Sequence, residues 1–128
     1  MSSSSSTTET ANATTTFTKE PIKKKVVKDE VTMYGQIDGA DKCGNCIDLD
    51  KTIKNEVTPK AEIPVDYKHY SVYNDEIGKR VAAEKKVEEI PYIERCAVAE
   101  DQTKKCEVIT GFNKEDWTKI GKQREEEF

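Results

Sequence analysis

The order of the hydrophobic patterns constrains the fold of this chain more than any other feature. Residues 31–36, VTMYGQ, predict a strand, and residues 65–73, VDYKHYSVY, predict a second strand whose polar content suits the edge of a sheet. Between them, apolar residues recur at spacings of three and four, which is typical of one helix face: Cys46, Leu49, Ile53 and Val57. A strand, a helix and a strand in this order predict a parallel, right-handed unit.

The second half of the chain predicts another helix and a hairpin. Asn74 or Asp75 can cap a helix through DEIGKRVAAEKKV. The buried side of this helix is expected to carry Ile77, Val81 and Ala82. The segments 90–98 and 106–112 then predict two strands on either side of a polar loop, which together form an antiparallel hairpin.

A last helix is expected after the hairpin. Asn113 is a favoured N-cap, Phe112 can pack on Trp117 as a hydrophobic staple, and Ile120 continues the apolar face. The charged end KQREEEF is expected to fray. The fold class is therefore α/β, with the order strand, helix, strand, helix, strand, strand, helix and a four-stranded mixed sheet.

The N-terminal part of the chain is expected to lie outside the folded domain. Of the 128 residues, only 34% are hydrophobic and 36% are charged, which is lean for a chain that packs along its whole length. Residues 1–16 are almost all Ser, Thr and small residues, and residues 19–30 form a lysine-rich segment. We therefore predict a disordered tail and basic linker at 1–28 and one domain at 29–128.

Charge and hydropathy give little sign of nucleic acid or membrane as a partner. The formal net charge is −4, from 21 basic and 25 acidic residues. No apolar run approaches the ~20 residues of a membrane-spanning helix, and the N-terminus lacks the pattern of a signal peptide. The sequence thus predicts a monomer in the reducing cytoplasm, where a close cysteine pair indicates redox chemistry or metal binding.

Cys43 and Cys46 flank Gly44 and Asn45 at the predicted start of the first helix. If that helix begins at Gly44, Cys43 is its N-cap and Cys46 its third residue. Unpaired backbone N–H groups and the positive end of the helix dipole then surround the Cys43 sulfur. Both favour the thiolate, which is the attacking form of cysteine. Cys46, one turn inside the helix, is placed to resolve a mixed disulfide formed on Cys43.

In these features the chain resembles the thioredoxin and glutaredoxin superfamily, over residues 31–120. Three features carry the resemblance: Cys43-Gly44-Asn45-Cys46 between a strand and a helix, Ile90-Pro91 opening a later strand, and a hairpin with Gly111 ahead of a closing helix. The resemblance implies a thioredoxin-like fold with three helices flanking the sheet. The chain departs from the family at Lys42, where an aromatic residue is usual.

The resemblance also implies a function. In that family the proline is cis and lies beside the active-site cysteines, and the backbone of the residue before it pairs with the substrate chain. Carried over, Ile90 and Pro91 form a peptide-docking edge, with Gly44 and Asn45 next to it. The implied activity is that of a thiol–disulfide oxidoreductase acting on protein disulfides. It needs no cofactor beyond its own redox-active disulfide, and a separate reductant recycles it.

Three alternatives stay open on the sequence. A non-catalytic binding module can use the same scaffold. A zinc site can use all four cysteines, although the nine residues between Cys96 and Cys106 are poor zinc-knuckle spacing. Those two cysteines can instead face each other across the hairpin, as a second disulfide or as free thiols. The single His69 lies in the predicted edge strand and is expected to be a surface residue rather than a ligand.

Overall fold

The computed structural model describes residues 22–128, so residues 1–21 of the predicted tail and linker at 1–28 fall outside the described part. The described residues form one mixed sheet and two α-helices. The strands are β2 (Lys23–Gly35), β3 (Val65–Ser71), β4 (Tyr92–Ala99), β5 (Lys104–Thr110) and β6 (Arg124–Glu127). The helices are α1 (Gly44–Thr52), continued by a π-helix at Ile53–Val57, and α2 (Glu76–Glu84), with a short 3-10 helix at Lys114–Trp117.

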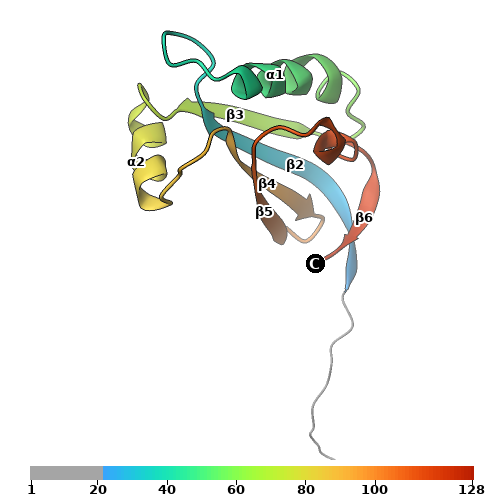
Figure 1. Ribbon diagram of the computed structural model, residues 1–128. Helices are drawn as coiled ribbons and strands as arrows, with labels where there is room; N and C mark the ends of the chain where they lie inside the picture. The colour runs from blue at the N-terminus through green and yellow to red at the C-terminus, as the bar shows by residue number, and fades with distance from the viewer. Residues whose placement is uncertain (1–21) are drawn as a thin grey trace, which may run out of the picture.

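The strands are ordered β3-β2-β4-β5, and β6 pairs with the beginning of β2 (Figure 1). β2 and β3 are parallel, with Met33 opposite His69, and the connection between them is α1. β2 pairs antiparallel with β4, and β4 with β5. The predicted parallel unit and the predicted hairpin are therefore both confirmed, in a sheet of five strands rather than four.

The main core lies between α1 and one face of the sheet. Side chains from β2 (Val31 and Met33), from β4 (Ile93) and from α1 (Leu49) are at most 1% exposed. Ile53 and Val57 of the π-helix and Trp117 of the 3-10 helix extend the same cluster. Figure 1 shows that α1 and the 3-10 helix lie on the same side of the sheet. The apolar spacing along residues 46–57 thus identified the buried face correctly.

The first strand begins earlier than the sequence predicts. Residues 23–28, where the sequence predicts a linker, form the first half of β2. Val26 in this half is fully buried and packs with Ile63 and Ala97 in a second small core. Only one side of this stretch faces the core, so lysines occupy the positions around Val26. The stretch therefore lacks the run of apolar residues by which a strand is recognised in a sequence.

The predicted third helix is replaced by the 3-10 helix and the strand β6. Asn113 does cap the turn, with its side chain accepting from the Glu115 N–H at 3.1 Å. Gly121 then adopts a φ of 79°, a left-handed conformation that a helix cannot continue and that glycine tolerates best. The chain turns back, so that residues 124–127 pair with residues 23–26 instead of fraying.

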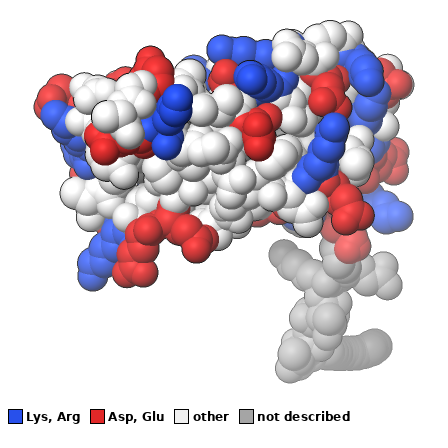
Figure 2. Space-filling view, turned by 45° about the horizontal axis from the view of Figure 1, so that its top comes forward, with Lys and Arg blue, Asp and Glu red and all other residues white. Residues whose placement is uncertain are grey.

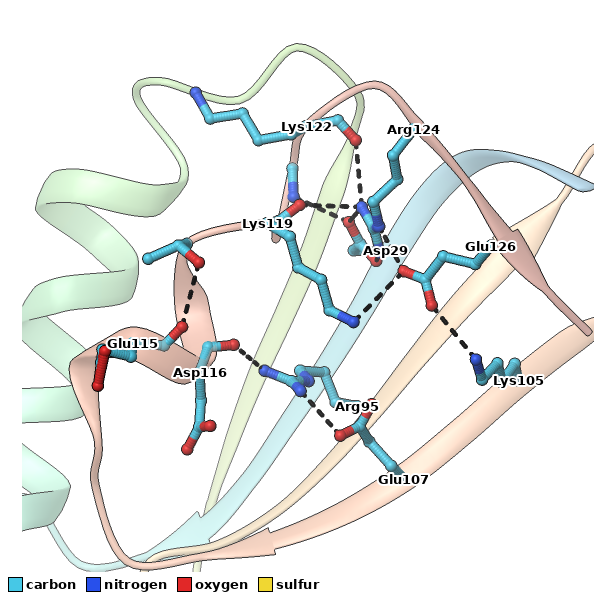
Figure 3. Close-up of polar contacts among 12 residues, drawn as sticks. Asp29, Arg95, Lys105, Glu107, Glu115, Asp116, Lys119, Lys122, Arg124 and Glu126 are labelled. Carbon is cyan, nitrogen blue, oxygen red and sulfur yellow. Dashed lines mark hydrogen bonds and ion pairs between the residues drawn. The ribbon is translucent and has the colours of Figure 1, made fainter.

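A buried ion pair holds this C-terminal segment in place (Figure 3). The Arg124 guanidinium donates to both carboxylate oxygens of Asp29, at 2.7 and 2.9 Å, and Asp29 is only 1% exposed. The Gly121 N–H donates to the same carboxylate at 2.8 Å. Such two-pronged, charge-assisted contacts are stronger than neutral hydrogen bonds. Arg95 similarly ties the 3-10 helix to the sheet by donating to the Asp116 carbonyl.

The buried side of α2 also differs from the prediction. Asp75 caps the helix as expected, accepting from the Ile77 N–H at 2.9 Å. Ile77 itself is 40% exposed, and Gly78 is the buried residue of the helix. A Cβ at position 78 would come within 2.0 Å of the Ser71 carbonyl oxygen. The backbone of α2 therefore packs closely against the end of β3 at Gly78, where there is no side chain. With Gly78 on the buried side of the helix, Ile77 faces solvent.

Candidate dithiol site

The Cys43 sulfur lies at the N-terminus of α1, where the sequence places it. Cys43 is the N-cap, and its sulfur accepts a hydrogen bond from the Cys46 N–H at 3.1 Å. The loop between β2 and α1 is closed by the Cys43 N–H, which donates to the Gln36 carbonyl at 2.9 Å. The N–H of position 46 and the helix end both favour negative charge on this half-buried sulfur.

Cys46 lies one turn inside the helix and is completely buried. Its sulfur packs against β2 at Gly35, where an added Cβ would lie 2.7 Å from it. Burial, reinforced by the neighbouring Cys43, raises the pKa of Cys46 to about 12. Cys46 is therefore a thiol at neutral pH, and it must lose its proton before it can attack another sulfur.

The segment before β4 borders the dithiol. The Ile90–Pro91 peptide bond is cis. The Cys43 thiol donates a hydrogen bond to the Ile90 carbonyl oxygen, with 3.7 Å between the sulfur and the oxygen. The Pro91 carbonyl accepts from the Gly111 N–H at 3.1 Å, which ties this segment to the end of β5. The structure thus brings Ile90 and Pro91 next to Cys43, although they lie far apart in the sequence.

Gly44 and Asn45, between the two cysteines, are both exposed. A Cβ at position 44 would meet no other atom within 4 Å, so the first turn of α1 is open to an approaching chain. Together with the edge at Ile90, these residues form one surface around Cys43. Gly44, Asn45 and the Ile90 carbonyl therefore lie beside the predicted nucleophile, whereas the Pro91 side chain is fully buried.

A polar cluster behind Cys46 was not identified from the sequence. Asp50 lies four residues after Cys46 on α1, and its carboxylate accepts from the Tyr67 hydroxyl of β3 at 2.7 Å. Burial, followed by this hydrogen bond, raises the pKa of Tyr67, and the charge of Cys46 contributes in the same direction. The spacing of Cys46 and Asp50 was visible in the sequence, but the position of Tyr67 depends on the register of the sheet.

His69 follows Tyr67 on the same face of β3 and is not the open surface residue that the sequence predicted. Its side chain is half-buried, and its Nε2 atom is buried with no hydrogen-bond partner within residues 22–128. Burial lowers the pKa of His69, so its ring tends toward the neutral form.

The second cysteine pair lies elsewhere in the sheet. Cys96 on β4 is directly opposite Cys106 on β5, and the two are bonded with an S–S distance of 2.07 Å. Cys96 pairs with Glu30 of β2, next to Val31, which faces α1. Because side chains alternate along a strand, the disulfide lies on the face opposite α1 and Cys46.

The four cysteines therefore do not converge. Within the described part of the chain, no group of three or more His, Cys, Asp or Glu side chains is arranged to hold a metal ion. Also within residues 22–128, no helix is both long and apolar enough to cross a membrane.

The face of the molecule that Figure 2 shows carries charges of both signs. Lys, Arg, Asp and Glu side chains are scattered over this face, with uncharged surface between them. Charge on this face thus favours neither a strongly acidic nor a strongly basic partner.

Comparison of the chain with family models, curated proteins and solved structures finds no match.

Proposed function

We propose that this protein is a thiol–disulfide oxidoreductase with a thioredoxin-like fold, which reduces or exchanges disulfides of protein partners in the cytoplasm. One observation carries the proposal. The Cys43 sulfur accepts the Cys46 N–H at a helix N-terminus, and Cys46 stands behind it as a second free thiol. The strand order β3-β2-β4-β5, the parallel β2–α1–β3 unit and the position of the Ile90 carbonyl next to the Cys43 sulfur support it further.

The reaction has two balanced steps. The Cys43 thiolate attacks one sulfur of a partner disulfide, forming a mixed disulfide and expelling the other sulfur as a thiolate. The Cys46 thiolate then attacks the Cys43 sulfur, which forms the Cys43–Cys46 disulfide and releases the second partner thiolate. The partner gains two electrons and the protein loses two. A separate dithiol reductant restores the protein by the reverse exchange.

The partner chain docks along the edge next to Cys43. In the free protein the Ile90 carbonyl faces the Cys43 thiol. Once the thiol has lost its proton, that carbonyl is free to accept an N–H from an extended partner segment. Gly44 and Asn45 leave room for the partner on the other side of the sulfur. No cofactor takes part, and the protein acts as a monomer.

A redox titration tests this proposal. The purified protein is equilibrated in glutathione or dithiothreitol buffers, its free thiols are alkylated, and the modified cysteines are located by mass spectrometry with zinc assayed on the same sample. We expect a reversible two-electron step at Cys43 and Cys46 without metal. Stoichiometric zinc, with all four cysteines protected, would instead indicate a metal-stabilised binding domain.

The assigned roles are tested by trapping. Cys46→Ser is expected to accumulate mixed disulfides on Cys43, because the resolving thiol is missing. The matched variant Cys43→Ser is expected to trap none, since Cys46 is buried. Equal trapping by both variants, or by neither, would contradict the assignment of nucleophile and resolving thiol.

A further inference from the structure

The resolving step requires that Cys46 lose its proton, so some group has to take this proton up. Cys46 is completely buried, and burial raises its pKa to about 12, so few molecules carry the thiolate at neutral pH. Without a base nearby, the second step would wait for hydroxide. A side chain that takes up the Cys46 proton during attack would remove this delay.

Asp50 and Tyr67 are placed to supply that base. Residues four apart share one face of a helix, so Cys46 and Asp50 both face the sheet. The Asp50 side chain is 13% exposed, and the Tyr67 hydroxyl donates to it at 2.7 Å. Tyr67 packs against the core cluster that contains Cys46.

We propose that the Asp50 carboxylate is the general base of the resolving step and that the Tyr67 hydroxyl passes the proton to it. The inference rests on the proposed oxidoreductase function. As Cys46 attacks the Cys43 sulfur, its proton moves to the Tyr67 oxygen and the Tyr67 proton moves to Asp50. The S–S bond between Cys46 and Cys43 forms, and the bond from Cys43 to the partner sulfur breaks. Asp50 then releases the proton to water.

The charged and titratable groups around this pair are few. Lys54, in the π-helix, has its Nζ 3.3 Å from the Asp50 carboxylate. His69, two residues after Tyr67 on β3, is close enough for the charge of Asp50 to act on it. The residues of β2 that face α1 carry no charge: Val31, Met33 and Gly35. Cys43 is the remaining titratable neighbour of Cys46. Among residues 22–128, His69 is therefore the competing base that the test has to distinguish from Asp50.

The test uses 5,5′-dithiobis(2-nitrobenzoate) in rapid mixing with the reduced dithiol. Because Cys96 and Cys106 are bonded, the dithiol is the group that reacts. Attack by Cys43 releases one thionitrobenzoate, and attack by Cys46 on the resulting mixed disulfide releases the second. The first phase reports the nucleophile, and the second phase reports the proposed base.

Asp50→Asn and Tyr67→Phe are each expected to slow the second phase about 100-fold or more relative to the first, near neutral pH. Between about pH 6 and pH 8 the second phase of the wild type should vary weakly, whereas in Asp50→Asn it should rise about tenfold per pH unit. A merely structural hydrogen bond would not change this pH profile. Asp48→Asn, at an exposed position of the same helix, is the matched control and should follow the wild type.

Two failures are distinguishable. A wild type that releases one thionitrobenzoate and stops would contradict the oxidoreductase function itself. A wild type with two phases, together with an unchanged second phase and pH profile in Asp50→Asn or Tyr67→Phe, would overturn only the base. Slowing of the second phase by His69→Asn with no slowing by Asp50→Asn would likewise overturn it and assign the proton to His69.

Discussion

At the start of α1 the Cys43 sulfur accepts a backbone N–H, with a free thiol one turn behind it. In the β4–β5 hairpin, by contrast, the sulfurs of Cys96 and Cys106 are bonded to each other across two strands whose backbone groups pair with one another. Both pairs bring two sulfurs together. They differ in their backbone surroundings. At the start of α1 a backbone N–H can stabilise one negatively charged sulfur, whereas in the hairpin the two sulfurs are bonded to each other.

This difference shows why spacing alone does not make a redox centre. In the helix, two intervening residues place the first cysteine outside the hydrogen-bonded turns and the second inside them. In the hairpin, both cysteines lie within strands and neither lies at a helix end, so no helix N-terminus favours one of the two sulfurs as nucleophile. The two pairs also differ in exposure, because Cys106 is exposed whereas Cys43 is partly buried. If exposure governs reactivity, Cys106 reacts faster than Cys43. If the helix N-terminus governs reactivity, Cys43 reacts faster.

The largest expected effect is on thiol reactivity in the fully reduced protein. We expect Cys43 to react with iodoacetamide at least about tenfold faster than Cys106, because the helix N-terminus stabilises the attacking thiolate. Cys46 should be the slowest, since its sulfur is buried. Brief alkylation followed by peptide mass spectrometry measures the four rates. If Cys106 were the fastest, exposure rather than the helix end would govern reactivity, and the contrast between the pairs would fail.

The next effect is on stability, and it should appear only in the hairpin pair. The Cys96–Cys106 bond joins residues 10 apart, and closing so short a loop stabilises a fold by up to about 3 kcal/mol in the chain-entropy view. The double variant Cys96→Ser/Cys106→Ser should lose up to that amount in urea denaturation. Its two phases of thionitrobenzoate release should match those of the wild type. Slower release by this variant would show that the two pairs are coupled.

Local signals in the sequence were enough to predict much of this molecule. The N-cap role of Cys43 follows from the start of an apolar helical pattern, and Asp75 is recognisable as a cap for the same reason. The hairpin follows from two strand-like segments on either side of a short polar loop. Each of these depends on residues within a few positions of one another.

The features that the sequence did not reveal depend on distant partners. The strand β6 is held by Arg124 through Asp29, 95 residues earlier, and a run of glutamates gives no local sign of a strand. The pairing of Asp50 with Tyr67 needs the parallel register of β2 and β3, which no short pattern specifies. The bonded state of Cys96 likewise depends on which residues oppose each other in the hairpin.

The smallest effect concerns pH, and it separates the buried thiol from the bonded pair, which does not titrate. The pKa of Cys46 is raised in the folded protein, to about 12, from about 8.5 in an unfolded chain. Above about pH 8.5 the unfolded state loses this proton while the folded state keeps it, so stability falls as the pH rises toward about 12. In a Cys43→Ser background, which prevents oxidation, the decline in the free energy of unfolding due to Cys46 should approach about 1.4 kcal/mol per pH unit.

Urea denaturation between about pH 8 and pH 10 measures this decline. The control is Cys43→Ser/Cys46→Ala, which shares every other titrating group, including Tyr67. Parallel stability curves for the two proteins would mean that Cys46 ionises as easily in the fold as outside it, and the resolving step would then need no base.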